Sequence, residues 1–147
     1  MALVHHTGLA PADIEASLRF YTEGVGLEVL MDVTVPSNLE GLLGVPTEKW
    51  RTVFLGDRSN PDAGILEILD LGTGHAQSEP PQPGVPVRGA CLLSFITPVQ
   101  EALARLEALG MGGTPRVVKT VSGGLAATVA DPDGVVVEFL DHAPSFG

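Results

Sequence analysis

The chain has 147 residues, an apolar content of 44% and a formal net charge of −10, from eight lysines and arginines against eighteen acids. This length suits one domain with a substantial core, and the apolar content excludes a disordered chain. The charge excludes the broad basic face that nucleic acids and anionic membrane surfaces require, so we expect neither as a partner.

The sequence holds one cysteine, which excludes an internal disulfide and is typical of a reducing compartment. The first residues, MALVHHTG, lack the basic and apolar regions of a signal peptide. No apolar run reaches the roughly 18–20 residues that cross a bilayer. We therefore expect a cytoplasmic protein without a membrane segment.

The first predicted module begins with a strand at residues 3–10 and continues into an amphipathic helix. Asp13 is predicted to cap the start of this helix, and Gly24 and Gly26 are predicted to end it. Further strands are expected at residues 28–35, 51–55 and 65–71, the last two joined across the turn NPDAG. Ser37 and Glu40 have capping-box spacing, which predicts a short helix between the first two of these strands.

The second predicted module follows a loop of four prolines and three glycines at residues 72–86. A strand at residues 89–96 leads into a helix with Pro98 at its first position and Gly110 at its end. Thr97 and Gln100 again have capping-box spacing. Three more strands are expected at residues 116–121, 125–130 and 135–141.

The plan of the first half therefore returns in the second. Setting Leu18 against Leu103 gives an offset of 85 residues (103 − 18), and the same offset sets His6 against Cys91. Each half reads as a βαβββ module, which indicates an α+β fold. We expect one domain over residues 1–147, with module one at about 3–71, a linker at 72–86 and module two at about 87–142.

The last strand of each half is apolar except for one acid. Glu67 lies in GILEILDL and Glu138 in GVVVEFLD, each six residues after the proline of a similar turn. Burying an unpaired carboxylate is costly, so acids at corresponding positions suggest a shared function. The alternative is that each acid lies on the solvent face of its strand.

The first strands contribute His6 and Cys91 at corresponding positions. If the halves pack about a pseudo-twofold axis, these side chains and the two acids would converge in one cavity. An imidazole and two carboxylates suit a divalent cation such as Zn²⁺, Ni²⁺, Mn²⁺ or Fe²⁺. The alternative readings are a structural histidine and a small buried apolar cysteine. Three arginines near predicted strand starts, Arg51, Arg88 and Arg116, do not form a recognisable anion-binding cluster.

These residues resemble the vicinal oxygen chelate superfamily, also called the glyoxalase/bleomycin resistance/dioxygenase superfamily. HHTGLAPADIEASLRFYTEGVGLEVL is similar to its opening module, DPDGVVVEFLD is similar to its closing strand, and the similarity spans about residues 3–142. The resemblance implies two βαβββ modules that form a U-shaped, largely antiparallel sheet around a central cavity and a metal. It also implies a homodimer, since the family commonly pairs modules across a dimer.

In this family the first and last strands of each module supply the metal ligands. Carried over by position, the resemblance implies His6, Glu67, Cys91 and Glu138. Most members have histidine where this chain has Cys91. A cysteine can bind zinc as a thiolate, but it departs from the two histidines and one glutamate that hold iron in the extradiol dioxygenases.

Two main hypotheses follow. In the first, the chain is a metal-dependent lyase or isomerase of the glyoxalase kind, with a cation that binds the vicinal oxygens of a small substrate and stabilises an enediolate-like intermediate. Glu138 or Glu67 then acts as the general base. In the second, the chain is a metal-free binding protein of the bleomycin-resistance type, which sequesters a drug or metabolite. Extradiol dioxygenase chemistry ranks behind both.

Overall fold

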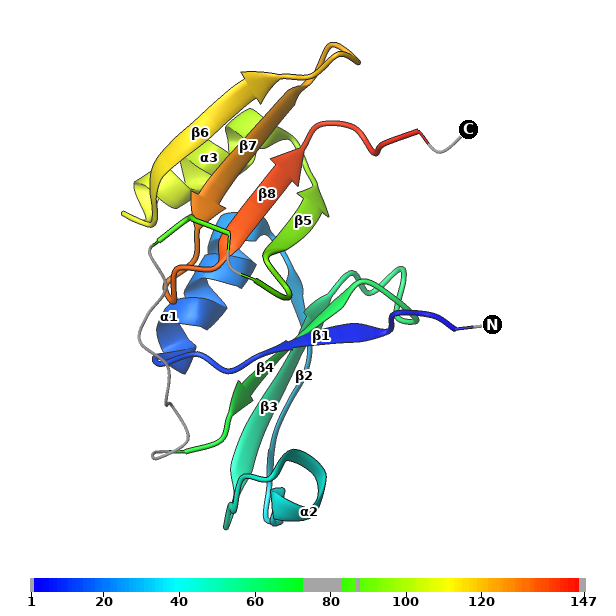
Figure 1. Ribbon diagram of the computed structural model, residues 1–147, viewed down its shortest axis with the longest axis vertical. Coiled ribbons are helices and arrows are strands. Elements are labelled where there is room, and N and C mark those ends of the chain that lie inside the picture. Colours follow the sequence, from blue (N-terminus) through cyan, green and yellow to red (C-terminus); the bar gives the residue numbers. More distant parts are fainter. Residues whose placement is uncertain (1, 73–82, 87, 146–147) are drawn as a thin grey trace. The chain divides into compact units, whose positions relative to one another are not determined.

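The computed structural model of the chain describes residues 2–72, 83–86 and 88–145 (Figure 1). The chain divides into two compact units, and the predicted linker at residues 72–86 lies mostly outside the described residues. Unit 1 comprises Met1–Thr22 and Gly26–Ser78, and unit 2 comprises Glu23–Val25 and Glu79–Gly147. No helix among the described residues is long and apolar enough to cross a membrane.

Unit 1 is a βαβββ module with one mixed four-stranded sheet. Its elements are β1 (His6–Leu9), α1 (Ile14–Arg19), β2 (Glu28–Val35), β3 (Trp50–Gly56) and β4 (Ile65–Asp70), with the short α2 (Glu40–Leu43) inserted between β2 and β3. The strand order is β1-β4-β3-β2, with β1 parallel to β4 and the other pairs antiparallel. The predicted module is therefore confirmed, and the insertion lies at the far end of the β2–β3 pair (Figure 1).

Period-two alternation gives the sheet of unit 1 a buried face and a partly open face. Val53 and Leu55 of β3 and Leu66 and Ile68 of β4 are almost completely buried. Glu67, between the last two, therefore points to the opposite face of the sheet. The same alternation that builds the core thus turns the predicted acid away from it.

Helix α1 begins as predicted, because the side chain of Asp13 accepts a hydrogen bond from the backbone N–H of Ala16 at 3.1 Å. It does not end at Gly24. The chain continues as a π-helix, η1 (Phe20–Val25), which ends at Gly26 with a left-handed φ of 99°. Gly24 is glycine for a different reason, since a Cβ at that position would collide with the side chain of Leu106.

The predicted capping box before α2 is wrong. The hydroxyl of Ser37 accepts from the indole N–H of Trp50 at 3.0 Å and so is engaged outside the helix. The side chain of Asn38 instead accepts from the N–H of Glu40 at 3.0 Å, within the first turn. Gly44 ends α2 in the left-handed region, as predicted.

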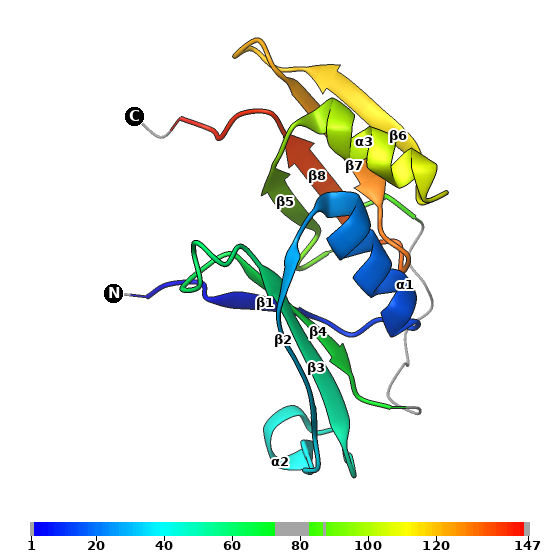
Figure 2. The same ribbon diagram turned by 180° about the vertical axis from the view of Figure 1, so that it is seen from behind.

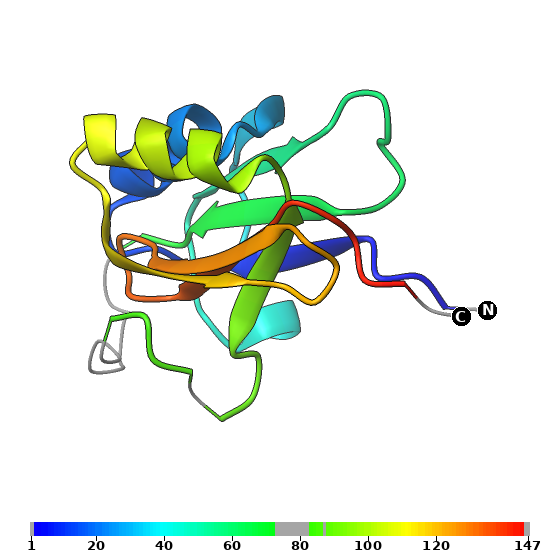
Figure 3. The same cartoon turned by 90° about the horizontal axis from the view of Figure 1, so that it is seen from above.

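Unit 2 repeats the module. Its elements are β5 (Leu92–Ile96), α3 (Val99–Ala108), β6 (Gly112–Lys119), β7 (Leu125–Ala130) and β8 (Val136–Leu140), in the strand order β5-β8-β7-β6. As in unit 1, the first and last strands pair in parallel. Helix α3 covers one face of this sheet (Figures 2 and 3), and it buries Val99, Ala102 and Leu106 against it.

The start of α3 differs from the prediction, which placed a capping box at Thr97 and Gln100. Pro98 keeps an extended ψ of 111°, so the helix begins one residue later, and no side chain of its own segment caps it. The carboxylate of Asp141 accepts from the N–H of Val99 at 2.9 Å in its place. A residue beyond the last strand therefore replaces the local cap.

Candidate functional site

Glu67 lies at the centre of the open face of unit 1, with its side chain 13% exposed. One carboxylate oxygen, Oε1, accepts a hydrogen bond from the hydroxyl of buried Thr52 at 2.8 Å. The other, Oε2, lies 3.4 Å from Nε2 of His6. Since β1 and β4 are parallel neighbours, the sheet itself brings the predicted imidazole and carboxylate together.

His6 has further neighbours that orient its ring. Its Nδ1 lies 2.9 Å from Nδ1 of His5, and its ring stands edge-on to Phe54 with centroids 5.7 Å apart. Phe54 is the partner of Glu67 across the β3–β4 pair. The imidazole, with its side chain 43% exposed, therefore lies beside an aromatic ring and a carboxylate on one face of the sheet.

Glu138 occupies the corresponding place in unit 2. It is half-buried on β8, and its Oε2 accepts a hydrogen bond from the hydroxyl of Ser94 at 2.7 Å. Ser94 lies opposite it on β5 and Thr128 lies opposite it on β7. Each unit thus presents one carboxylate oriented by a hydroxyl donor.

The strand register relates the two halves differently from the sequence offset. Gly8 pairs with Glu67, and Ser94 pairs with Glu138, so the strands are offset by 86 residues (94 − 8). In this register Leu92, not Cys91, corresponds to His6. The predicted offset of 85 aligns the helices. The connection between the first strand and the helix is therefore one residue longer in unit 1 than in unit 2, relative to this alignment.

Cys91 is half-buried and directly precedes β5. The donor that β5 places beside Glu138 is Ser94. Sequence reasoning missed Ser94 and Thr52, because a hydroxyl next to an acid is recognisable only when the register is known. A one-residue shift in register turns every side chain of a strand to the other face, and no local pattern reveals it.

Each acid belongs to a row of residues that crosses its sheet. The row in unit 1 consists of Met31, Phe54, Glu67 and Gly8. The row in unit 2 consists of Arg116, Thr128, Glu138 and Ser94. Along its row, unit 1 thus places apolar residues beside its acid, whereas unit 2 places a cation and two hydroxyls.

The donor pair in unit 1 fits a divalent cation in its chemistry. An imidazole nitrogen and a carboxylate oxygen are ligands that Zn²⁺, Mn²⁺ and Fe²⁺ share. Across residues 2–72, 83–86 and 88–145, no three or more His, Cys, Asp or Glu side chains gather in a metal-binding group. In unit 1, His6 and Glu67 are therefore the two side chains whose donor atoms lie close enough together to be candidate metal ligands.

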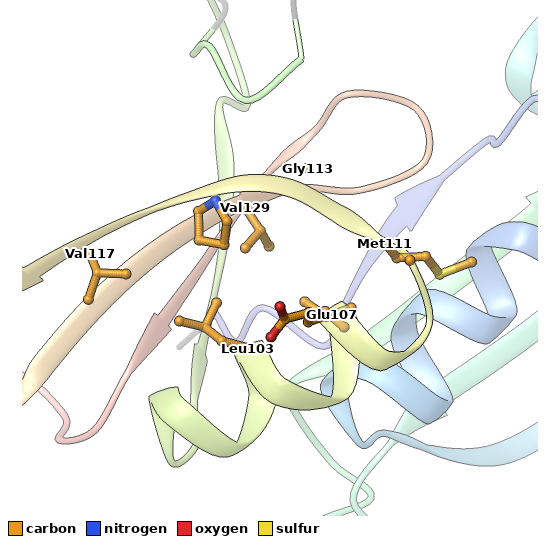
Figure 4. Close-up of a pocket in the computed structure, with 9 residues that line it drawn as sticks. Leu103, Glu107, Met111, Gly113, Val117 and Val129 are labelled. Atoms are coloured by element: carbon orange, nitrogen blue, oxygen red, sulfur yellow. The ribbon is translucent and has the colours of Figure 1, made fainter.

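Unit 2 also has a pocket of about 620 Å³ between α3 and β6 (Figure 4). Leu103, Glu107 and Met111 line it beside Val117 and Val129. Val117 and Val129 each directly follow a member of the row of Glu138 in the sequence, so their side chains point to the opposite face of the sheet. The pocket therefore lies on the face that α3 covers. It is distinct from the candidate site.

Comparisons with known proteins relate this chain to one superfamily. The sequence profile of the "Glyoxalase/Bleomycin resistance protein/Dioxygenase superfamily" matches residues 3–139. A "Lactoylglutathione lyase-like protein terB" from Aspergillus terreus is 33% identical over 147 aligned positions, which cover 91% of this chain and 72% of the relative.

Two solved structures share the fold. The glyoxalase family protein APC24694 from Bacillus cereus has a TM-score of 0.79 at 12% identity, with 95% of this chain and 93% of that chain covered. A trypanothione-dependent glyoxalase I from Leishmania major has a TM-score of 0.66 at 22% identity, with 95% and 86% covered. At these identities the two structures support the α+β architecture of paired βαβββ modules.

Proposed function

The chain belongs to the glyoxalase/bleomycin resistance protein/dioxygenase superfamily, and we propose from this membership that it is a metal-dependent lyase or isomerase. Its substrate would be a small molecule with vicinal oxygens. The observation that carries this proposal is the pair of strand-borne carboxylates, Glu67 and Glu138, each oriented by a hydroxyl donor on the open face of its sheet.

The geometry suits these acids to proton transfer. A hydroxyl that donates to one carboxylate oxygen fixes the plane of the group and leaves the second oxygen to meet a substrate proton. For Glu138 the fixed oxygen is Oε2, held by Ser94, and Oε1 is the oxygen that would take the proton. A general base positioned in this way contributes about 10²–10⁴-fold to a rate.

We propose His6, Glu67, Cys91 and Glu138 as the metal ligands. The cation would supply Lewis-acid polarisation of the vicinal oxygens of the substrate. The contact between His6 and Glu67 supports this part of the proposal, since the two residues present their donor atoms 3.4 Å apart. Thr52 would keep the carboxylate of Glu67 turned toward His6.

The first test is metal content by elemental analysis of protein purified without chelator or affinity-tag metal. We expect near-stoichiometric zinc, nickel, manganese or iron in the wild type and its loss in His6→Gln and Glu67→Gln. Glu101→Gln, an exposed acid of α3, is the matched control and should keep the metal. Cys91→Ala and Glu138→Gln establish whether those two residues are ligands.

Turnover is then tested with 2-oxoaldehydes combined with thiols and with acyl-CoA epimers. Glu138→Gln should lower kcat by about 10²–10⁴-fold if Glu138 is the general base. Protein that takes up none of these cations on reconstitution would refute the metal-dependent mechanism.

A second candidate function is a metal-free protein that binds a drug or metabolite. The strand register favours it, because Ser94 rather than Cys91 is the neighbour of Glu138 on β5. In that case the metal content should be negligible in the wild type and in every variant. Bleomycin-type drugs should then raise the thermal unfolding midpoint of protein to which no metal has been added.

We further propose a homodimer in the cytoplasm. The dimer follows from what is common in the family, and the location from the single cysteine, which is typical of a reducing compartment. The net charge of −10 argues against nucleic acid as a partner.

A further inference from the structure

Arg116 lies in the same row as Glu138, on the same face of the sheet of unit 2. It pairs with Thr128, which in turn pairs with Glu138. Neighbouring strands are about 4.8 Å apart, so the backbones at Arg116 and Glu138 are separated by roughly 10 Å along the row. An arginine side chain and a short substrate together can span this distance.

The charge of Arg116 is not compensated by carboxylates in the way that the charges of Arg51 and Arg58 are. Arg51 forms ion pairs of 2.8 Å with both Asp32 and Glu15, and Arg58 lies 3.9 Å from Glu28. No carboxylate within the described part of the chain forms an ion pair with Arg116. Arg116 as a whole is an exposed residue, so an incoming anion can reach it.

The guanidinium is nevertheless held in place. Its Nη1 donates to the backbone carbonyl of Gly84 at 2.7 Å. Gly84 is buried, and its own N–H donates to the carbonyl of Gly134 at 3.2 Å, in the turn before β8. A neutral carbonyl thus orients Arg116 without cancelling its charge, and most of its five N–H donors stay available.

A cavity of about 250 Å³ lies beside this guanidinium. The residues that line it include Arg116 itself, Thr114, Thr128, Gly112 and Gly113. Hydroxyls next to an oriented guanidinium provide further donors for a planar oxyanion, and the fork of an arginine matches a carboxylate in a bidentate manner.

We propose that Arg116 is the specificity residue of this face and binds a carboxylate of the substrate. The inference rests on the proposed function, in which Glu138 acts on that substrate. It also explains the asymmetry of the two rows, since unit 1 has Met31 where unit 2 has Arg116. A singly charged carboxylate is preferred to a phosphate dianion, because a net charge of −10 repels the dianion more strongly.

The test uses the full chain and a matched pair of probes, mandelate and mandelamide. Both carry vicinal oxygens and the same ring, and they differ in charge. Binding is read from the amide chemical shifts of Thr114, Arg116 and Thr128. We expect Arg116→Gln to weaken mandelate binding by about 10–100-fold, the value of a charged hydrogen bond, and to leave mandelamide unchanged.

Two further variants make the result specific. Arg58→Gln removes an exposed arginine of unit 1 and should keep the wild-type affinity for mandelate. Arg116→Lys retains the charge and should keep part of that affinity, which also covers the case in which Arg116→Gln is misfolded.

Three results would overturn the proposal. Equal loss of both probes in Arg116→Gln would show that Arg116 only fixes the backbone at Gly84. If mandelate does not shift the amide signals of Thr114, Arg116 and Thr128 in the wild type, these residues do not form a carboxylate site. Inorganic phosphate that binds there more tightly than mandelate would assign a different anion. The assay measures binding and not turnover. Its result therefore does not depend on whether the protein proves to be a lyase.

Discussion

At the scale of single residues, the side chain of Asp141 joins two separate segments of unit 2. Its Oδ1 accepts from the N–H of Val99 at 2.9 Å, and its Oδ2 accepts from the N–H of Leu125 at 2.7 Å. These two backbone hydrogen bonds favour the ionised form and hold the pKa of the carboxyl below its usual range, with a smaller contribution from His142. One side chain thus caps α3 and fixes the start of β7.

The lowered pKa predicts how stability depends on pH. A carboxyl with a depressed native pKa contributes its full stabilisation above its ordinary pKa of about 3.9, and this contribution is lost as the pH falls through the native value. Asp141→Asn should therefore lower the thermal unfolding midpoint at pH 7, and the difference from the wild type should shrink as the pH falls below about 4.

Circular dichroism melts across this pH range would measure both effects. Asp62→Asn, an exposed acid in the turn before β4, is the control and should follow the wild type. A gap between Asp141→Asn and the wild type that stays constant down to pH 2 would contradict the role of the charge.

At the scale of elements, the close approach of η1 to α3 depends on a glycine. The guanidinium of Arg105 donates to the carbonyl of Gly24 at 2.9 Å and to the carbonyl of Val25 at 3.3 Å, at the end of η1. The backbone at Gly24 rests on Leu106, which is 1% exposed. A larger residue would have to displace a side chain that is packed in the core.

We therefore expect Gly24→Ala to destabilise the protein by about 1–3 kcal/mol, the usual cost of overpacking a core. The control is Gly41→Ala in α2, where an added Cβ meets nothing within 4 Å. That change should be neutral or stabilise by about 0.5–1 kcal/mol, since alanine favours the helix. Urea unfolding would compare the two, and equal midpoints would show that Leu106 yields without cost.

At the scale of the whole molecule, apolar side chains remain on the open sheet faces that carry the acids. Met31 and Val33 are 45% and 37% exposed in unit 1, and Ile96 and Val118 are 56% and 62% exposed in unit 2. Exposed apolar surface of this kind is commonly covered by a ligand or another protein chain. It is consistent with the proposed homodimer.

Light scattering coupled to size-exclusion chromatography would test the dimer. With a chain mass of 15.3 kDa, we expect a particle of about 30.6 kDa (2 × 15.3) at micromolar concentration. A mass of 15.3 kDa across the concentration range would contradict the proposal. A heterologous protein of similar size and known mass serves as the calibration control.

Local patterns were sufficient for much of this protein. The internal repeat predicted two βαβββ modules, and Asp13 was correctly predicted as a cap. These features depend on residues within a few positions of one another, where periodicity and hydrogen-bonding chemistry can be read directly.

The tertiary structure decided what depends on distant partners. It set Leu92 rather than Cys91 in register with His6, placed Ser94 and Thr52 beside the acids, and supplied Asp141 as the cap of α3 from 42 residues away. It also placed Arg116 in the row of Glu138. Register and long-range caps depend on how strands pair across a sheet, and no local stretch of sequence contains that information.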